Sequence, residues 1–277
     1  MLSLPKTGSD LIKMKLINYH LHTKLCGHAT GEVEDYIKMA IKKNLAEIGF
    51  ADHAPWPEKI RTGITMAPEE TELYLNLIEK NKKKFADQIS IKIGFEVDFP
   101  FLPSFNQKYL NDQRIDFIIG SCHIVKGWAF DLPGASQEFA QKNIDQVYQD
   151  YYESVEKLVK TRKFDIVGHF DVIKKYGYRS KKDFSAIIDK IARLLAANKM
   201  TAEINTSGLL KPVKEIYPSN SILKIFFDRN VPITLGTDAH EPEKIDFYLK
   251  ETIQKIKKIG FRKISTFSKR KKYELNL

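Results

Sequence analysis

Short runs of apolar, β-branched residues recur along the chain, and longer stretches with a helical spacing of apolar positions separate them. The runs begin about 25 to 50 residues apart, which leaves room for one strand and one crossover helix in each interval. This alternation predicts seven β/α units. The expected strands are Leu16–Tyr19, Ala46–Phe50, Ser90–Phe95, Ile115–Gly120, Asp165–Gly168, Met200–Ile204 and Val231–Gly236.

The stretches between these strands are amphipathic, with apolar residues three or four positions apart. Pro68 is expected to open the second helix, because proline suits the first helical turn. The expected apolar faces are Val33, Ile37, Ala40 and Ile41; Leu73, Leu77 and Ile78; Ile144, Val147, Tyr151, Val155 and Leu158; Phe184, Ile187, Ile188, Ile191 and Leu195; Ile222, Ile225 and Phe226; and Ile245, Leu249, Ile253 and Ile256.

Consecutive β/α units favour an α/β fold with a parallel sheet, and no Gly/Ser-rich or Pro-rich linker divides residues 1–277. We therefore expect a single domain. Polar residues follow nearly every expected strand, which favours a closed barrel, because barrel enzymes carry their active sites at that end. Two long connections, Val97–Gln113 and Ile124–Lys142, are expected to carry specificity.

Composition excludes a disordered or membrane-spanning chain. The hydrophobic fraction is 43% with 11% aromatic residues, enough for a sizeable core. No run approaches the roughly 18 apolar residues of a spanning helix. Residues 1–10 lack the basic and apolar regions of a secretory signal, and two cysteines cannot build a disulfide framework. We expect a cytoplasmic protein.

The net charge of +10 does not by itself indicate a particular partner. Only eight of the 45 basic residues are arginine, and the lysines are spread over helix faces, as at positions 38, 42 and 43. A nucleic-acid-binding protein would more often cluster its basic residues and favour arginine. A solvated surface that attracts small anions is the expected role, with no nucleic-acid or membrane partner.

All seven histidines lie at or just beyond the carboxyl end of an expected strand. They are His20, His22, His28, His53, His123, His169 and His240, and the carboxylates Glu96 and Asp238 have the same placement. A single histidine there is more often an ordinary hydrogen-bonded residue. Seven together are hard to explain by packing, because each buried imidazole would need its own partner.

Neutral imidazole and carboxylate are the usual ligands of Zn²⁺, Mn²⁺ and Fe²⁺. In His20-Leu-His22 the two-residue period of a strand directs both rings to one side, and Asp238-Ala-His240 repeats that arrangement. Glu96 has two oxygens and could bridge two ions. The set predicts a polynuclear metal site.

These residues resemble the PHP (polymerase and histidinol phosphatase) family, whose fold is a distorted (β/α)7 barrel. The nine positions match the ligand positions of that family. The resemblance implies three divalent ions (zinc, manganese or iron). One would be held by His20, His22, Glu96 and Asp238, a second by Glu96, His123 and His169, and a third by His28, His53 and His240.

Three segments are similar to the histidinol-phosphate phosphatase branch of the family: 51–57, 121–131 and 203–208. The resemblance implies hydrolysis of L-histidinol phosphate in histidine biosynthesis, with a metal-bridging hydroxide attacking phosphorus. One alternative is a phosphoesterase of the same family that acts on nucleotides or oligonucleotides. Another is a metal-stabilised binding module without turnover, which the complete ligand set disfavours. The sequence leaves the metals and the oligomeric state open.

For residues other than the metal ligands, the sequence gives weaker evidence for a catalytic role. Arg179 is the expected phosphate-binding cation, and an ordinary surface charge is the alternative. Asp52, beside His53, is expected either to protonate the leaving group or to support the ligands. Glu203 is expected to be a buried hydrogen-bond partner behind the ligands. Cys26 and Cys122 are expected to fill space rather than bind metal.

The long connection after the fourth strand supplies the expected substrate contacts. Trp128 is expected to stack on the substrate imidazole, with packing of the loop by Trp128 and Phe130 as the alternative. Asp131 is expected either to bind the substrate ammonium group or to start a turn at Pro133-Gly134, and Lys126 is also assigned to substrate binding. The basic tail 269–272 is expected to be a solvated end.

Overall fold

A computed structural model describes residues 16–61, 63–132 and 134–277, so the sequence interpretations of residues 1–10 and Pro133 lie outside the described residues. The seven expected strands form one sheet in which every neighbouring pair is parallel. In sheet order they are β1 (Leu16–Leu21), β2 (Leu45–His53), β3 (Ser90–Asp98), β4 (Phe117–Ser121), β7 (Ile166–Val167), β8 (Thr201–Asn205) and β9 (Ile233–Gly236). The prediction of seven parallel strands is confirmed.

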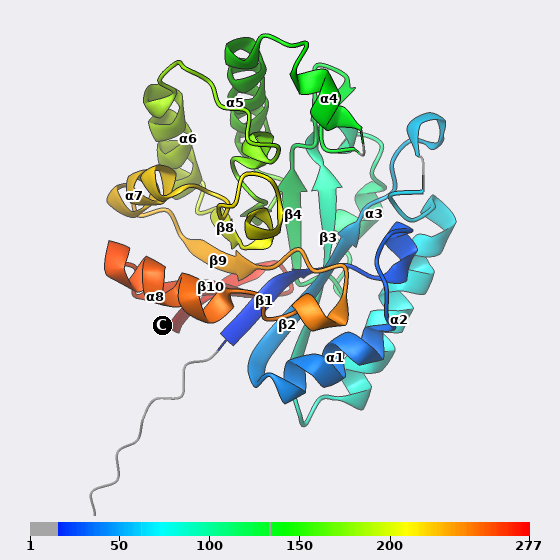
Figure 1. Ribbon diagram of the computed structural model, residues 1–277. Helices are drawn as coiled ribbons and strands as arrows, with labels where there is room; N and C mark the ends of the chain where they lie inside the picture. The colour runs from blue at the N-terminus through cyan, green and yellow to red at the C-terminus, as the bar shows by residue number, and fades with distance from the viewer. Residues whose placement is uncertain (1–15, 62, 133) are drawn as a thin grey trace, which may run out of the picture.

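The sheet curves until its first and last strands meet. Leu21 of β1 and Ala239, beyond β9, form an isolated parallel bridge. The His22 N–H donates to the Ala239 carbonyl at 3.1 Å, and the Ala239 N–H donates to the His20 carbonyl at 3.3 Å. The result is a nearly closed barrel with the helices around it (Figure 1), as a PHP-type (β/α)7 barrel requires.

The helices are α1 (Val33–Lys42), α2 (Thr71–Lys84), α3 (Gln107–Leu110), α4 (Ala135–Phe139), α5 (Ile144–Thr161), α6 (Ser185–Ala197), α7 (Asn220–Asp228) and α8 (Leu249–Ile259). Short 3₁₀ helices are η1 (Lys24–Cys26), η2 (Glu58–Ile60), η3 (Pro68–Glu70), η4 (Phe99–Phe101), η5 (Val172–Lys174), η6 (Ser207–Leu210) and η7 (Pro242–Lys244). None of the helices in the described ranges is long and apolar enough to cross a bilayer.

Most of the expected apolar faces pack inward. The buried face of α2 differs from the one that the spacing of apolar residues predicts. Its buried face contains Tyr74, Leu75 and Ile78, whereas Leu73 is 57% exposed. Pro68 opens the 3₁₀ helix η3 rather than α2 itself. Because residues 71, 74, 75 and 78 follow the helical period, position 73 points away from the sheet.

The basic tail 269–272 is exposed at Lys269 and Lys271, as expected, but it is not a free end. Residues Lys263–Ser268 (β10) and Lys271–Asn276 (β11) form an antiparallel hairpin. Its turn residue Arg270 forms an ion pair with Asp165, and the Phe267 N–H donates to the Tyr19 hydroxyl at 2.7 Å. The hairpin therefore lies against residues at the amino ends of the barrel strands.

A second small hairpin shapes the long connection after β4. It pairs β5 (Ile124–Val125) with β6 (Trp128–Ala129), and its turn is Lys126-Gly127. Both turn residues have positive φ, 51° and 79°, as a tight two-residue hairpin turn requires. This turn directs the side chains of the connection and decides which of them reach the cavity described below.

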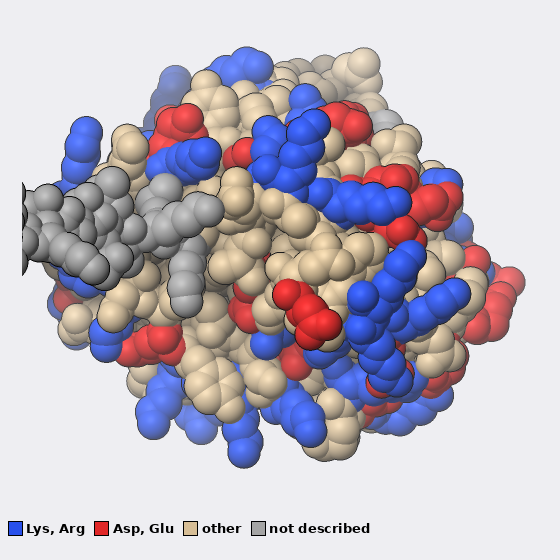
Figure 2. Space-filling model, turned by 90° about the horizontal axis from the view of Figure 1, so that it is seen from below, with Lys and Arg blue, Asp and Glu red and all other residues tan. Residues whose placement is uncertain are grey.

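The surplus of basic residues is dispersed. Figure 2 shows one face of the molecule, on which lysine and arginine side chains lie in separate groups with acidic and uncharged residues between them. Several lysines are neutralised locally, such as Lys84, whose Nζ lies 2.8 Å from Glu34. This arrangement agrees with a solvated basic surface.

Candidate metal centre

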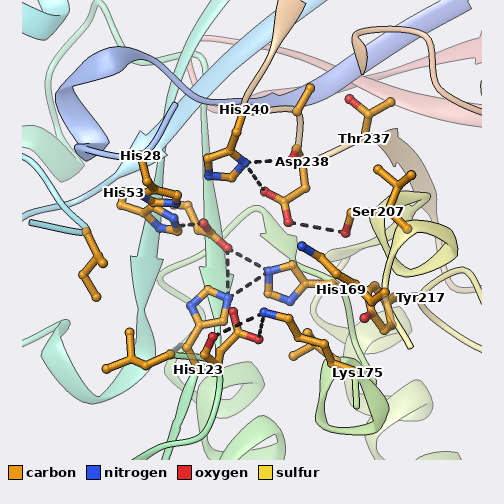
Figure 3. A pocket seen from close by; sticks show the side chains of 18 of the residues that line it. His28, His53, His123, His169, Lys175, Ser207, Tyr217, Thr237, Asp238 and His240 are labelled. Carbon is orange, nitrogen blue, oxygen red and sulfur yellow. Dashed lines mark hydrogen bonds and ion pairs between the residues drawn. The ribbon is translucent and has the colours of Figure 1, made fainter. Parts of the chain in front are cut away.

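The nine expected ligands converge at the carboxyl end of the barrel, where parallel strands bring their ends together. They come from β1 (His20), the position directly after β1 (His22), the loop after η1 (His28), β2 (His53), β3 (Glu96) and the segments after β4 (His123), β7 (His169) and β9 (Asp238, His240). Seven of them line a cavity of about 580 Å³, and the remaining two, His20 and His22, are fully buried. Figure 3 shows His28, His53, His123, His169, Asp238 and His240 around the cavity.

Glu96 lies between two groups of imidazoles. Its Oε1 is 2.9 Å from His169 Nε2 and 3.7 Å from His123 Nε2. Its Oε2 is 3.4 Å from His20 Nε2 and 2.8 Å from His53 Nδ1. Each carboxylate oxygen therefore faces different ring nitrogens, which is the arrangement that a bridging ligand needs.

A second carboxylate completes the group around β1. Asp238 Oδ1 lies 3.0 Å from His22 Nε2 and 3.8 Å from His20 Nε2. Asp238 has a φ of 51°, a conformation that non-glycine residues rarely adopt and that is common at functional sites. This backbone turns the carboxylate toward His20 and His22 at the carboxyl end of the neighbouring strand β1.

The third group of rings lies nearer the cavity. The His28 and His240 rings stack with centroids 4.4 Å apart, and donor atoms of His22, His53 and His240 lie within 4.8 Å of one another. Nδ1 of His28 contacts the Cys26 carbonyl at 2.9 Å, and Nδ1 of His240 contacts the Asp238 carbonyl at 3.0 Å. These contacts leave Nε2 of both rings as the donor atom for an ion.

Several of these donor atoms form ion-pair contacts at most and make no hydrogen bond to the described residues. Within the described residues, His20 Nε2, His22 Nε2, Glu96 Oε2 and His240 Nε2 are buried without a hydrogen bond. Buried polar atoms are nearly always satisfied, so four in one cluster indicate a missing partner. Lone pairs of nitrogen and carboxylate oxygen fit a divalent cation such as zinc.

The charges of the cluster complement one another. Burial alone would raise the pKa of Glu96, but the imidazoles of His20, His53 and His123 hold the pKa of that carboxyl well below its usual range. Burial lowers the pKa of His123, and Asp98 and Glu96 more than offset this, raising it to about 10. The Glu96 carboxylate and the surrounding imidazoles therefore each stabilise the charged form of the other.

A layer of buried acids orients the ligands from behind. Glu203 Oε1 lies 2.7 Å from His20 Nδ1, and Glu203 Oε2 accepts the His169 N–H at 2.7 Å, so its expected role is confirmed. A Cβ on Gly236 would lie 1.9 Å from Glu203 Oε1, so only glycine leaves room for this carboxylate. Asp98 supports His123 in the same way, with Oδ1 3.0 Å from Nδ1.

The sequence interpretation did not assign Asp98, although a signal was available. Asp98 follows Glu96 by two residues on β3 and therefore projects to the same side of the strand. Its second oxygen accepts the Trp56 indole N–H at 2.8 Å. This hydrogen bond connects the segment after β2 to the metal-binding end of the barrel.

Asp52 is fully buried and does not line the cavity. Its Oδ1 lies 3.5 Å from His22 Nδ1 and accepts the His53 N–H at 2.9 Å, while Oδ2 accepts the Thr23 N–H at 3.2 Å. The contacts agree with support of the ligands, and they offer no path from the carboxyl group to a leaving group in the cavity.

The cavity holds a cation that the sequence interpretation missed. Lys175 Nζ lies 2.6 Å from Asp131 Oδ1, and both residues line the cavity near His123 and His169 (Figure 3). Although burial lowers the pKa of Lys175, the Asp131 carboxylate raises it above its ordinary value, so the ammonium stays charged. Lys175 follows His169 by six residues, a spacing that gave no signal on its own.

The structure does not bring Arg179 or Lys126 to the cavity lining. The Arg179 side chain is 47% exposed and pairs with Glu215, Nη2 to Oε2 at 2.9 Å. Lys126 sits at the β5–β6 turn with its side chain 65% exposed, and Nζ lies 3.9 Å from Asp150. Of the expected contacts outside the ligands, Asp131 alone lines the cavity.

Trp128 packs the connection instead of facing the cavity. Its ring meets Phe139 edge-on with centroids 4.8 Å apart, and Lys142 Nζ lies 4.2 Å from its centroid. Of the residues of the β5–β6 hairpin, only Ala129 contributes to the lining. These contacts agree with the alternative role of Trp128, in which the ring stabilises the loop. They do not agree with stacking on a substrate imidazole.

This placement reverses the expected effect of Trp128→Ala. We expect a loss of about 2 kcal/mol in the free energy of unfolding, because a partly buried aromatic ring is removed. KM should change less than about twofold for either a histidinol ester or p-nitrophenyl phosphate. Urea unfolding and steady-state kinetics test this, with Trp128→Phe as the control. A selective rise in KM for the histidinol ester would contradict it.

Comparison with known proteins adds a family and several relatives. Residues 18–207 match the family model described as the PHP domain. A Deinococcus radiodurans protein named "Probable histidinol-phosphatase" is 33% identical over 257 residues, which cover 92% of this chain and 98% of that protein. A Bacillus subtilis protein named "Histidinol-phosphatase" is 26% identical over 259 residues, covering 82% of this chain and 94% of that one.

A solved structure is also similar over nearly the whole chain. The histidinol phosphate phosphatase of Lactococcus lactis, in a complex with zinc, L-histidinol and phosphate, gives a TM-score of 0.78 at 27% identity. The match covers 94% of this chain and 99% of that chain.

Proposed function

The chain belongs to the PHP-domain family, and from this membership we propose that it hydrolyses L-histidinol phosphate to L-histidinol and inorganic phosphate, a step of histidine biosynthesis. One observation carries the proposal. The Lactococcus lactis enzyme that matches nearly the full length of this chain binds zinc, L-histidinol and phosphate, and this chain presents nine convergent ligands in the same fold. A biosynthetic role and two buried, free cysteines support a cytoplasmic location.

We assign three divalent ions to the nine ligands. His20, His22, Glu96 and Asp238 would hold one ion, Glu96, His123 and His169 a second, and His28, His53 and His240 a third. Zinc, manganese and iron all suit this donor set. Bound ions of this kind supply Lewis acidity, which activates water and neutralises the charge of a phosphoryl group.

The three-ion assignment predicts a metal content close to three per chain, because the nine ligands are assigned to three groups with one ion each. Elemental analysis of protein purified without chelator measures it. His28→Ala should lower the content by about one ion, since His28 serves only the third group, whereas Cys26→Ala should leave it unchanged. A reproducible content of one ion in the unmodified chain would exclude the assignment.

The remaining residues of the cavity suit a phosphate ester of an amino alcohol. In place of Arg179, we assign phosphate binding to Lys175, because its charged ammonium lies beside the ligands and is held there by Asp131. Asp131 then orients Lys175 rather than binding the substrate ammonium group. Glu241, an exposed carboxylate of the cavity lining, is the assigned partner of that group.

A substrate panel tests the proposal directly. Steady-state kinetics of the metal-loaded protein should give a kcat/KM for L-histidinol phosphate at least 100-fold above those for nucleoside 5′-monophosphates and p-nitrophenyl phosphate. A short oligonucleotide belongs in the same panel. Highest efficiency on a nucleotide or oligonucleotide would replace the substrate assignment, and binding without turnover of any ester would overturn enzymatic function.

A further inference from the structure

We propose that Tyr217 is a further substrate-binding residue, whose phenol O–H donates a hydrogen bond to a phosphoryl oxygen of the ester in the cavity. The inference rests on the proposed phosphatase function and names a contact that neither the motifs nor the metal ligands supply. Three features carry it: the position of the ring, the state of its hydroxyl, and the charges around it.

The Tyr217 ring is held rigidly at the cavity wall. Its backbone bridges to the end of β8, with the Asn205 N–H donating to the Tyr217 carbonyl at 2.6 Å and the Tyr217 N–H donating to the Asn205 carbonyl at 2.9 Å. The ring lies edge-on to the ligand His169 with centroids 6.4 Å apart. A Cβ on Gly208 would lie 2.8 Å from Tyr217 Cζ, so glycine permits this close packing.

The hydroxyl of this ring has no protein partner in the described part of the chain, although Tyr217 is only 1% exposed and lines the cavity. Two other fully buried tyrosines do find one. The Tyr74 hydroxyl donates to the Gly94 carbonyl at 2.8 Å, and the Tyr151 hydroxyl donates to the Phe170 carbonyl at 3.0 Å. A buried donor without a partner is costly, unless a ligand satisfies it.

The surroundings identify the chemistry of that ligand. Figure 3 shows Tyr217 at the same side of the cavity as His169 and Lys175, the residues that flank the expected phosphoryl position. The phenol of a tyrosine is protonated at neutral pH, because its ordinary pKa is about 10. The hydroxyl is therefore a neutral donor beside a lysine ammonium, a combination that suits the oxygens of a phosphate monoester.

The chain offers a matched control for removing this oxygen. Tyr36 on α1 is also fully buried with an unpartnered hydroxyl, but it does not line the cavity. Tyr36→Phe and Tyr217→Phe are thus the same chemical change in equally buried rings. Only the second is expected to affect phosphate binding.

The experiment compares the inhibition constant of inorganic phosphate in the metal-loaded unmodified chain, Tyr217→Phe and Tyr36→Phe. We expect Tyr217→Phe to raise that constant about 10- to 100-fold, the range for a hydrogen bond to a charged group. The kcat/KM should fall by a similar factor for both L-histidinol phosphate and p-nitrophenyl phosphate. Tyr36→Phe should stay within about twofold, and both variants should keep their metal content and melting temperature.

Unchanged phosphate inhibition in Tyr217→Phe would overturn the proposal, and so would an effect confined to L-histidinol phosphate, which would place the contact on the amino-alcohol part. Loss of metal from Tyr217→Phe would also contradict it, because the hydroxyl would then support the ligands. A different result would contradict the proposed function, namely a preference of the unmodified chain for another phosphomonoester. In that case the phosphate inhibition constants still decide the role of Tyr217.

Discussion

Replacing Glu96 by glutamine is expected to reduce kcat by at least a thousandfold. The two oxygens of Glu96 face different histidine groups, at 2.9 Å from His169 Nε2 and 3.4 Å from His20 Nε2. An amide keeps the shape of the side chain but removes the negative charge that would hold two cations together. Turnover at saturating L-histidinol phosphate, with metal content measured on the same samples, tests the prediction.

Cys122→Ala is the matched control for Glu96→Gln. Cys122 is equally buried and directly precedes the ligand His123, and burial raises the pKa of its thiol far above neutral pH. The thiol therefore fills space in the core, so we expect its removal to change kcat less than about threefold. Equal losses in the two variants, at equal metal loading, would contradict both assigned roles.

Lys175→Met is expected to lower kcat/KM about 100- to 1000-fold, the cost of removing one preorganised donor from a developing phosphoryl charge. Methionine retains the length and apolar stem of the side chain while it removes the ammonium that Asp131 holds at 2.6 Å. The loss should include a raised inhibition constant for inorganic phosphate. Lys175→Arg should recover part of the activity.

Arg179→Met separates the two candidate cations. Because Arg179 pairs with Glu215 outside the cavity lining, its replacement should change kcat/KM less than about threefold. A large loss in Arg179→Met together with a small one in Lys175→Met would restore the expectation drawn from the sequence. The comparison needs equal metal content in both variants, which elemental analysis provides.

The metal-binding end of the barrel could be predicted from the sequence because parallel strands impose their own geometry. Once His20, Glu96 and His123 are placed at strand ends, the sheet brings them together whatever the loops do. Glu203 was predictable for the same reason, since a buried carboxylate on a central strand needs a partner nearby. At these positions the sequence pattern and the topology of the sheet place the side chain in the same location.

The substrate-facing residues could not be predicted in the same way, because they depend on loop conformation. Lys126 and Trp128 lie close to the ligand His123 in sequence, but the tight β5–β6 turn directs them away from the cavity. Lys175 and Tyr217 reach it from connections with no motif of their own. The C-terminal hairpin was missed because its turn, Lys269-Arg270, lacks the glycine or asparagine that usually marks one.

The closure between β1 and Ala239 has a consequence for the life of the protein in the cell. His20 lies on the first barrel strand and His22 directly follows it, whereas Asp238 and His240 follow the last barrel strand, so bound ions would join segments that are more than 200 residues apart in the chain. An unfolded chain has no such preformed site, so metal binding adds directly to the free energy of folding. The cellular abundance of this protein should therefore rise and fall with the availability of its metal. Chains that lack metal should be degraded by proteases before they bind substrate.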